Sequence, residues 1–373
     1  MNENDLSLLR ACVQPLTDWY AVNRRELPWR NDPTPYTVWI SEIMLQQTRI
    51  EAVIPYYLRF LRELPDVAAL AACDEERLLK LWEGLGYYSR ARNLKKTAET
   101  VMADFGGELP RTAAALRTLP GIGDYTAGAI ASIACGEGEP AVDGNVLRVV
   151  MRLLACSDDV MSQKTKSAVS EALRRIYPRG EAAALLTEGL MELGETVCIP
   201  NAEPRCLLCP LCGHCRAAQS GTAALYPVRS AKKQRRIEAR TVLLLHCGER
   251  YAIEKRPGKG LLAGLWQLPN REGALGLDEL RQLLISKGMA PLRIEALGEA
   301  KHIFTHVEWH MVGYRVALAA ECSPFVWKTA AELETDYAIP TAFRAYTKYL
   351  YYAYWLNSAI PDIQKMWLSQ KSA

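Results

Sequence analysis

Five of the eleven cysteines of this chain fall within one short stretch, between Cys198 and Cys215. Four of them follow the pattern Cys198-x7-Cys206-x2-Cys209-x5-Cys215, and Cys212 adds a fifth thiol. In a long chain without a signal sequence, such a cluster is more typical of a metal site than of a disulfide framework. Four soft sulfur ligands in one loop suit both tetrahedral zinc and a 4Fe-4S cluster. The stretch therefore predicts metal binding and leaves the metal open.

Composition sets the class of protein. With 373 residues, of which 49% are hydrophobic and 23% charged, the chain is long enough for two or three globular domains. No apolar stretch approaches the roughly 20 residues that a membrane span needs, and the first residues, MNENDLSLLR, are acidic where a signal peptide is basic. We therefore expect a cytoplasmic protein without a membrane partner. The net charge of +3 is too small to indicate nucleic-acid binding by itself.

Two patterns of hydrophobic residues divide the chain. Up to about residue 217, apolar residues recur at helical spacing in the segments DLSLLRACVQPLTDWY, AAALRTLPG, AVSEALRRIY and AALLTEGLMELG. The basic stretch VRSAKKQRR then indicates a solvated linker. Beyond it, RTVLLLHCGERYAIEKRP and VEWHMVGYRVALAA suit strands, whereas LDELRQLLISKG and AFRAYTKYLYYAYWL suit helices. The sequence thus predicts a multidomain protein, with an all-α domain at 1–217, a linker at 218–237 and a smaller α+β domain at 238–368.

The segment LPGIGDYTAGAI predicts two helices joined by a tight turn. A new helix begins near Asp124, and Gly121 and Gly123 allow the chain to turn before it. The amides at the start of this helix would face outward, where a phosphate oxygen can accept from them regardless of base sequence. A plain connection between helices is the alternative, although Tyr125 adds a phenol just inside the helix.

Two carboxylates stand at contrasting positions on predicted helices. Glu42, in WISEIMLQQT, falls well inside a helix that begins with a Thr34 N-cap and Pro35. Burial among its apolar neighbours would raise its pKa, as a general acid near neutral pH requires, although a surface position is equally consistent with the segment. Asp143, in AVDGNVLRVVMRLL, suits a helix N-cap. A catalytic role can coexist with that cap, because nearby amides hold a carboxylate in its ionised form.

Together these motifs resemble the adenine DNA glycosylases of the MutY type, within the helix-hairpin-helix superfamily that also contains endonuclease III. The matching segments follow the family's order: ELPWR, PYTVWISEIMLQQT, LWEGLGYYSRARNL, LPGIGDYTAGAI, VDGNV and the cysteine loop. The resemblance implies an all-helical, two-lobed glycosylase that binds double-stranded DNA and holds an extruded adenine in the cleft between its lobes. It also implies base-excision repair of adenine opposite 8-oxoguanine by a monomer that is nucleoid-associated when bound to DNA, and it leaves removal of adenine opposite guanine open.

The resemblance assigns complementary roles to the two carboxylates. Glu42 would be the general acid at adenine N7, and Asp143 would stabilise the sugar cation or bond to it, a division of labour that also occurs in glycosidases. Superfamily members that also cut the strand carry a lysine in place of Tyr125, and its amine forms a Schiff base with the sugar. A tyrosine cannot do so, hence we expect a monofunctional enzyme that leaves an abasic site. Tyr125 is expected to hydrogen-bond near Asp143, with Asn145 either as a second partner or as a plain polar residue of the helix's first turn.

Further roles come from the same resemblance. Gln47 and Tyr87 would push into the base stack when adenine leaves it, because an amide or a ring replaces lost stacking. For Tyr87, a place in the core is the alternative. The residues that would line the adenine pocket are Trp29, Arg30, Leu45 and Glu188. Core packing is the alternative for Leu45 as well.

The C-terminal domain resembles the family's Nudix-like recognition domain. It lacks the glutamate-rich box that binds magnesium in Nudix hydrolases, so we do not expect nucleotide hydrolysis. The family's lesion-reading loop, Phe-Ser-His, corresponds to Phe304, Thr305 and His306 in this chain. Threonine keeps the hydroxyl of serine and adds a methyl group. We expect this loop to contact 8-oxoguanine.

By resemblance, the cysteine loop would hold a 4Fe-4S cluster through Cys198, Cys206, Cys209 and Cys215. It departs from the family in one respect, since seven residues rather than six follow Cys198. With Cys212 this creates a rival set, in which Cys212 replaces Cys198, that is similar to the start of a bacterial ferredoxin motif. We favour the set with Cys198, because this residue ends a helix at the family's position and a loop absorbs one extra residue easily.

Overall fold

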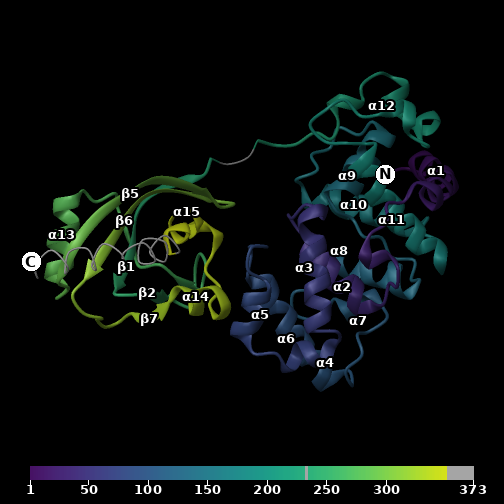
Figure 1. The fold of residues 1–373 in the computed structure, drawn as a ribbon. Helices are drawn as coiled ribbons and strands as arrows, with labels where there is room; N and C mark the ends of the chain where they lie inside the picture. The colour runs from purple at the N-terminus through teal and green to yellow at the C-terminus, as the bar shows by residue number, and fades with distance from the viewer. Residues whose placement is uncertain (232–233, 351–373) are drawn as a thin grey trace, which may run out of the picture. The chain divides into compact units, whose positions relative to one another are not determined.

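The computed structural model describes residues 1–231 and 234–350, and the chain divides into two compact units (Figure 1). The first unit comprises Met1–Cys73 and Ser89–Lys232, and the second comprises Asp74–Tyr88 and Lys233–Ala373. The domain limits expected at 217 and 238 stay predictions. Ala223, inside the expected linker, is buried in the core of the first unit. Within the described residues, none of the helices combines the length and apolar character that a membrane crossing needs.

Helices build the first unit, as the helical spacing of its apolar residues predicts. Its α-helices are α1 (Glu3–Asn23), α2 (Pro35–Leu45), α3 (Ile50–Glu63), α4 (Val67–Ala72), α6 (Ser89–Asp104), α7 (Ala113–Leu116), α8 (Asp124–Ala129), α9 (Gly144–Leu154), α10 (Gln163–Arg174), α11 (Glu181–Thr196) and α12 (Arg216–Gln219). Shorter turns of other helix types are η1 (Pro28–Arg30), η2 (Ile130–Ala134), η3 (Cys206–Leu208), η4 (Cys212–His214) and η5 (Ala223–Leu225).

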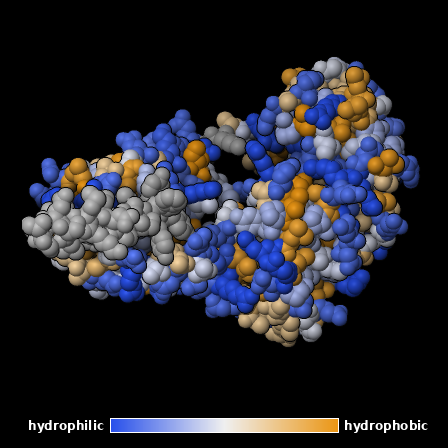
Figure 2. Space-filling model, viewed as in Figure 1, coloured by the Kyte–Doolittle hydropathy of each residue, from blue (hydrophilic) through white to orange (hydrophobic). Residues whose placement is uncertain are grey.

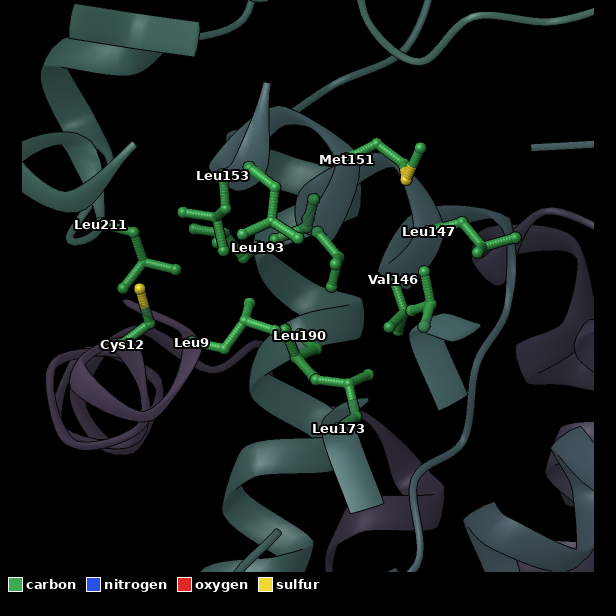
Figure 3. Packing of buried hydrophobic residues seen from close by; sticks show 14 of the residues in the cluster. Leu9, Cys12, Val146, Leu147, Met151, Leu153, Leu173, Leu190, Leu193 and Leu211 are labelled. Carbon is green, nitrogen blue, oxygen red and sulfur yellow. The ribbon is translucent and has the colours of Figure 1, made fainter. Parts of the chain in front are cut away.

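One apolar core joins segments from both ends of the first unit (Figure 3). Leu9 of α1, Leu153 of α9 and Leu193 of α11 all belong to it. Leu211 and Cys215, from the cysteine-rich stretch, are also buried there. The loop is therefore fixed by burial of its own apolar side chains in the core that it shares with α1 and with α9, the helix that Asp143 caps.

Helix α2 is buried on nearly all sides, because α3, α8 and η2 pack around it. It begins as the sequence predicts, with the Thr34 hydroxyl accepting from the amide of Thr37 and Pro35 in the first helical position. The neighbouring helix α3 is amphipathic and buries Val53 and Phe60. Figure 2 shows apolar residues over the region of α3, where Leu58 is exposed. Because neighbouring elements enclose α2 on nearly all sides, a carboxylate on this helix lies among apolar side chains.

The turn between α7 and α8 contains two glycines, Gly121 and Gly123, and only the first has a backbone conformation that favours glycine. Gly121 has φ of +74°, and a Cβ placed on it would lie 2.7 Å from the Cβ of Asn93. Gly123 is the N-cap of α8 with φ of −92°, a conformation open to any residue, so the backbone requires glycine at Gly121 and not at Gly123. The predicted start of the second helix at Asp124 is confirmed.

A mixed sheet forms the second unit. The described strands are β1 (Arg236–Cys247), β2 (Arg250–Lys255), β3 (Trp266–Gln267), β4 (Asn270–Glu272), β5 (Pro291–Ile303), β6 (Val307–Leu318) and β7 (Val326–Thr329). The main path runs β3-β2-β1-β6-β5, with β4 on β1 and β7 on β2. β1 and β6 pair in parallel, whereas β5 and β6 are antiparallel. The predicted strands on both sides of Gly248 and the predicted strand beginning at Val307 are confirmed.

Alternating side chains of β1 supply two cores on opposite faces of the sheet (Figure 1). Leu244 faces the core that α14 and α15 cover, whereas Leu243 faces the core that α13 covers. On the first face, Gly313 of β6 lies against Tyr346, since a Cβ there would fall 1.9 Å from the ring. The α+β class predicted for this part of the chain is confirmed.

The described helices of the second unit are short. They are α5 (Glu75–Leu81), α13 (Leu277–Ser286), α14 (Ala330–Asp336), η6 (Thr341–Phe343), α15 (Arg344–Thr347) and η7 (Lys348–Leu350). The helix predicted for LDELRQLLISKG is confirmed by α13. The helix predicted for AFRAYTKYLYYAYWL coincides with η6, α15 and η7 up to Leu350, and its remaining residues, 351–356, lie outside the described residues, as do 357–368 of the predicted domain.

Candidate active site

A cavity of about 360 Å³ in the first unit collects most of the residues expected to act on the substrate. Its walls come from η1, from α2 and the residues after it, and from the starts of α8 and α9 and one side of α11. The sequence-predicted residues that line it are Trp29, Arg30, Glu42, Leu45, Gln47, Tyr125, Asp143, Asn145 and Glu188. Tyr87 belongs to the second unit and is 48% exposed, so the alternative of a core aromatic is wrong.

Glu42 is only 6% exposed, which decides between the buried and surface positions that the sequence leaves open. Burial raises its pKa from 4.5 to about 7. The negative charge of Asp143 also raises this pKa, whereas a hydrogen bond from Tyr125 opposes the rise. At neutral pH the carboxyl group is therefore divided between its acid and its base form, the state in which a side chain can give up a proton readily.

Tyr125 contacts a different carboxylate from the one expected. Its hydroxyl donates to Oε2 of Glu42 at 2.5 Å, so the prediction of a bond near Asp143 is wrong for this structure. The reason is tertiary, because α8, which carries Tyr125 in its first turn, packs against α2. Burial and the adjacent Glu42 charge raise the pKa of Tyr125 well above 10, so the phenol is a donor at physiological pH.

Asp143 is the N-cap of α9, as predicted. Its Oδ1 accepts from the amide of Val146 at 2.7 Å, and its Oδ2 accepts from Nδ2 of Asn145 at 2.9 Å. The pKa of Asp143 is nevertheless raised above its usual value, because burial outweighs the amide hydrogen bonds. The N–H groups at the helix start therefore oppose the rise in the pKa of Asp143 without cancelling it, and the ionised state expected for this group stays a prediction. Asn145 is a hydrogen-bond partner of Asp143. Gly194 of α11 leaves room for Asn145, because a Cβ on this glycine would lie 2.7 Å from the Cβ of Asn145.

Two buried arginines, missed in the sequence, connect the start of α9 to the cysteine loop. Nη2 of Arg148 donates to Oδ1 of Asn145 at 2.9 Å, and its Nε donates to the carbonyl of Cys198 at 2.7 Å. One turn later, Nη1 of Arg152 lies 3.2 Å from Sγ of Cys198 and also donates to the carbonyl of Ile199. The spacing of the two arginines places them on one side of α9, a signal that the sequence did contain.

An ion network also missed in the sequence backs the cavity. Glu192, with a side chain 1% exposed, binds Nε of Arg25 at 2.5 Å and Nη2 of Arg30 at 2.8 Å. Burial would raise the pKa of Glu192, but these two hydrogen bonds bring it below its usual value. Burial raises the pKa of the neighbouring Glu188, whose Oε2 accepts from the Tyr20 hydroxyl at 3.0 Å. Glu192 follows Glu188 by one helical turn, so helical spacing could have pointed to it.

The five clustered cysteines line one hollow beside Arg152. Cys198 and the rival Cys212 both face it, so the structure brings the thiols of both proposed sets together. Arg152 donates to the sulfur of Cys198, and its carbonyl oxygen accepts from the thiol of Cys215 at 3.4 Å, so two cysteines of the favoured set are tied to α9. Among the residues described, no three Cys, His, Asp or Glu side chains are already arranged as a metal site.

In the second unit, the predicted lesion-reading residues form the turn between β5 and β6. The amide of Phe304 donates to the carbonyl of Val307 at 2.8 Å, which closes the turn and leaves Thr305 and His306 exposed. The ring of Phe304 packs edge-on against Trp309, with centroids 5.0 Å apart. Within this unit the hydroxyls of Tyr87 and Thr305 lie 2.6 Å apart.

Comparison with known protein families gives one match for each part of the chain. Residues 40–179 match the model of the HhH-GPD superfamily base excision DNA repair proteins, and residues 240–349 match that of the NUDIX domain. Adenine DNA glycosylase of Mus musculus is 32% identical, over 92% of this chain and 79% of the relative. That of Homo sapiens is also 32% identical, over 91% and 74%. That of Buchnera aphidicola subsp. Schizaphis graminum (strain Sg) is 32% identical, over 82% and 87%.

Solved structures agree with these sequence matches in the helical part. A thermostable thymine-DNA glycosylase is 26% identical, with a TM-score of 0.51 over 57% of this chain and 98% of that one. Endonuclease III in a non-covalent complex with DNA is 26% identical, with a TM-score of 0.50 over 59% of this chain and 99% of that one. Because its curated relatives match over most of their length in both animals and bacteria, this chain belongs to the family of adenine DNA glycosylases.

Proposed function

We propose that this chain hydrolyses the N-glycosidic bond of adenine opposite 8-oxoguanine in duplex DNA and leaves an abasic site. The observation that carries the proposal is the placement of two carboxylates in one cavity with different hydrogen-bond partners. Glu42 has a pKa of about 7 and can donate a proton, whereas Asp143 accepts two N–H bonds that favour its anion. This is the pairing that cleavage between a base and a sugar requires.

The reaction divides its charges between these two groups. As the bond between the sugar and N9 breaks, its electron pair moves into the purine, and the proton of Glu42 on N7 neutralises the charge that develops there. The sugar is left with cationic character, which the negative charge of Asp143 stabilises. Water then adds to the sugar, and its proton restores the acid form of Glu42, so that the products are free adenine and an abasic site. The hydrogen bond from Asn145 keeps the carboxylate of Asp143 oriented toward the cavity.

The cavity suits a purine in size and polarity. About 360 Å³ falls within the range of small-molecule pockets. Trp29 offers an aromatic surface, and the carboxylate of Glu188 can accept from an exocyclic amino group. Arg30, which Glu192 holds at 2.8 Å, adds N–H donors for ring nitrogens. An adenine presents both kinds of partner, an amino group and ring nitrogens.

A 4Fe-4S cluster held by Cys198, Cys206, Cys209 and Cys215 forms part of the proposal. The fit rests on the donor set, since these thiols line one hollow and Arg152 directs an N–H to the Cys198 sulfur. When bound, such a cluster supplies a redox-capable iron-sulfur centre that cross-links the loop. The chain's own contribution is the anchoring of the loop to α9 through Arg148 and Arg152.

The remaining site residues concern the DNA duplex. We assign phosphate binding to the hairpin turn at Gly121 and Gly123, where the N-cap of α8 has no side-chain acceptor. Gln47 and Tyr87 take the role of wedges, which suits their exposure. The exposed Thr305 and His306 on the turn between β5 and β6 take the role of 8-oxoguanine contacts, next to Phe304.

The central experiment follows adenine release from a duplex with one adenine opposite 8-oxoguanine. Excess protein is mixed with the duplex, and alkali then converts abasic sites into strand breaks. The wild type is expected to give alkali-dependent breaks, and Glu42→Gln to give almost none within the same time. Absence of adenine release by the wild type refutes the proposal. Trapping of a covalent adduct with borohydride would contradict the monofunctional assignment, because Tyr125 has no amine to form one.

A second experiment tests recognition of 8-oxoguanine separately from catalysis. The matched variants are Thr305→Val, which keeps the shape and loses the hydroxyl, and Thr305→Ser, which keeps the hydroxyl and loses the methyl group. We expect Thr305→Val to reduce the preference for adenine opposite 8-oxoguanine over adenine opposite guanine, and Thr305→Ser to retain it. Equal preferences in all three proteins would remove Thr305 from the recognition site.

A further inference from the structure

Arg90, in the first turn of α6, reaches the C-terminal end of α2. Its Nη1 lies 2.5 Å from the carbonyl oxygen of Ile43, 3.3 Å from that of Met44 and 2.9 Å from that of Gln46. Carbonyls in the last turn of a helix lack N–H partners within the helix, and the negative end of the helix dipole favours a cation there. One guanidinium group thus gathers the carbonyls at the end of the helix that also carries Glu42.

Gln47, the residue after the carbonyl groups that Arg90 contacts, has an unusual backbone conformation. Its φ is +60°, in the left-handed region that residues with a side chain seldom enter. Such conformations persist where the surrounding structure enforces them, and they concentrate at functional sites. Gln47 is also exposed and borders the cavity of the candidate active site. The carbonyl of Gln46, which Arg90 contacts, belongs to the peptide bond that joins Gln46 to the strained residue Gln47.

The same face of α6 also meets the hairpin turn. Asn93, three residues after Arg90, lies against Gly121. A Cβ added to this glycine would fall 2.7 Å from the Cβ of Asn93. Arg90, Asn93, Gln46 and Gly121 line one small cavity of about 70 Å³. Helix α6 therefore links the end of α2 with the segment assigned to phosphate binding.

We propose that Arg90 is the positioning residue that fixes Gln47 for insertion into the base stack. The inference rests on the proposed function, because it assumes that Gln47 acts as a wedge. A planar amide can fill the place of an extruded base only if its backbone is held still against the stack. Arg90 supplies that rigidity, since its guanidinium ties together the carbonyls immediately before Gln47. Lysine, a point charge on a flexible stem, matches this geometry less well.

A purely structural role for Arg90 makes a different prediction. If Arg90 only stabilised the fold, its loss would slow the enzyme by the same factor whether or not Gln47 is present. If it acts through Gln47, its loss matters little once the Gln47 side chain has been removed. A double-mutant cycle separates the two cases, because it measures the coupling between residues directly.

The test compares wild type, Arg90→Met, Gln47→Ala and the double variant in single-turnover adenine release from the duplex with adenine opposite 8-oxoguanine. We expect Arg90→Met to slow release at least tenfold in the wild-type background and less than threefold in the Gln47→Ala background. Arg90→Lys is expected to fall between Arg90→Met and the wild type. Lys96→Met, which removes one exposed charge from the same helix, serves as the matched control and is expected to leave the rate unchanged.

Equal factors in the two backgrounds, or an unchanged rate in Arg90→Met, would overturn the inference. If Arg90→Met does not fold, the same cycle is measured with Arg90→Lys. A second readout separates the inference from the proposed function: 2-aminopurine next to the mismatch should become brighter when wild type or Glu42→Gln binds, and much less so with Arg90→Met. Unstacking by the wild type without adenine release by the wild type would refute the proposed function and keep the positioning role. A protein that neither unstacks the reporter nor releases adenine would refute both.

Discussion

Glu42 and Asp143 face the same cavity from opposite kinds of helical position. Glu42 lies in the middle of the buried helix α2 and accepts a hydrogen bond from a phenol, whereas Asp143 caps the start of α9 and accepts two N–H bonds. Burial raises the pKa of both groups, but backbone and side-chain N–H donors oppose this rise at Asp143. Helix position thus gives two similar carboxylates different hydrogen-bond partners, and in the proposed function these partners suit Glu42 as the proton donor and Asp143 as the fixed anion.

The largest expected effect comes from removing the charge of Asp143 without removing its cap. Asparagine caps helices as well as aspartate does, so Asp143→Asn should melt within a few degrees of the wild type. Its single-turnover rate should nevertheless fall about 10³-fold, because the sugar cation loses its counter-charge. Asp143→Ala is expected to lose the same activity and, in addition, about 1 kcal/mol of stability. A fully active Asp143→Asn would break the comparison, since the aspartate would then be only a cap.

The pH dependence of the rate tests the other carboxylate. Only protonated Glu42 can donate, so the single-turnover rate should be constant below about pH 7 and fall tenfold per pH unit above it, until Asp143 is itself protonated in acid. A pH-independent rate between pH 6 and pH 9 would remove Glu42 as the acid.

Stability should change with pH in the same direction. A folded-state pKa of about 7, above the ordinary 4.5, means that Glu42 contributes its full stability below 4.5 and loses it as pH rises through 7. Glu42→Gln is never charged, so thermal melting should show it gaining stability over the wild type on going from pH 5 to pH 8. The opposite trend would show that the carboxylate form is the stabilised one.

Gly194 tests how closely the surroundings of Asp143 are packed. A methyl group on it would meet the Cβ of Asn145 at 2.7 Å, so Gly194→Ala should cost about 1 to 3 kcal/mol in the free energy of unfolding. The rate should also fall, by about tenfold, because Asn145 would lose its place beside Asp143. Gly189→Ala, on the same helix, places a methyl group 3.3 Å from Leu16 and Tyr20, a tight but less severe contact, and serves as the comparison variant with a smaller expected loss. Equal losses in both variants would argue against a specific role for this contact.

Tyr125→Phe should have the smallest effect and the most diagnostic one. The Tyr125 hydroxyl lowers the pKa of Glu42, so its removal should move the alkaline limb of the rate profile to higher pH. A hydrogen bond worth about 1 kcal/mol corresponds to about a fivefold change in the protonated fraction. Rates measured from pH 5 to pH 9 would show this shift. Movement of the acid limb instead would place the phenol beside Asp143 during the reaction.

Features that depend on local sequence could be predicted well. The Thr34 cap, the Asp143 cap and the strands around Gly248 follow from short patterns of residue types, and each is present in the structure. The burial of Glu42 was undecided in its own segment, because it depends on helices that pack around α2. The fold class of each part was also predictable from local patterns. Apolar residues recur at helical spacing along the first part and at strand spacing along the second.

Partners that come from distant segments could not be predicted in the same way. The bonds from Arg25 to Glu192 and from Tyr125 to Glu42 join residues far apart in the chain, and no local pattern encodes them. The raised pKa of Asp143 could not be predicted from its own segment, because burial is a tertiary property. A pair of glycines also does not show which of the two has a left-handed backbone, and the dihedral angles assign that conformation to Gly121 and not to Gly123.

The assembly of the cavity from segments between Arg25 and Glu195 has a consequence for biosynthesis. A ribosome that adds roughly 5 to 20 residues per second makes Glu42 about 8 to 30 s before Glu192. During this interval Glu42 exists without the arginine-binding Glu192 of α11 and without the cysteine loop that Arg148 and Arg152 tie to α9. A chain that ends before α11 therefore carries this carboxyl group in an incomplete cavity. The cavity is complete only after Glu195 has been made, when residues 74–88 of the second unit already exist and the strands of its sheet do not.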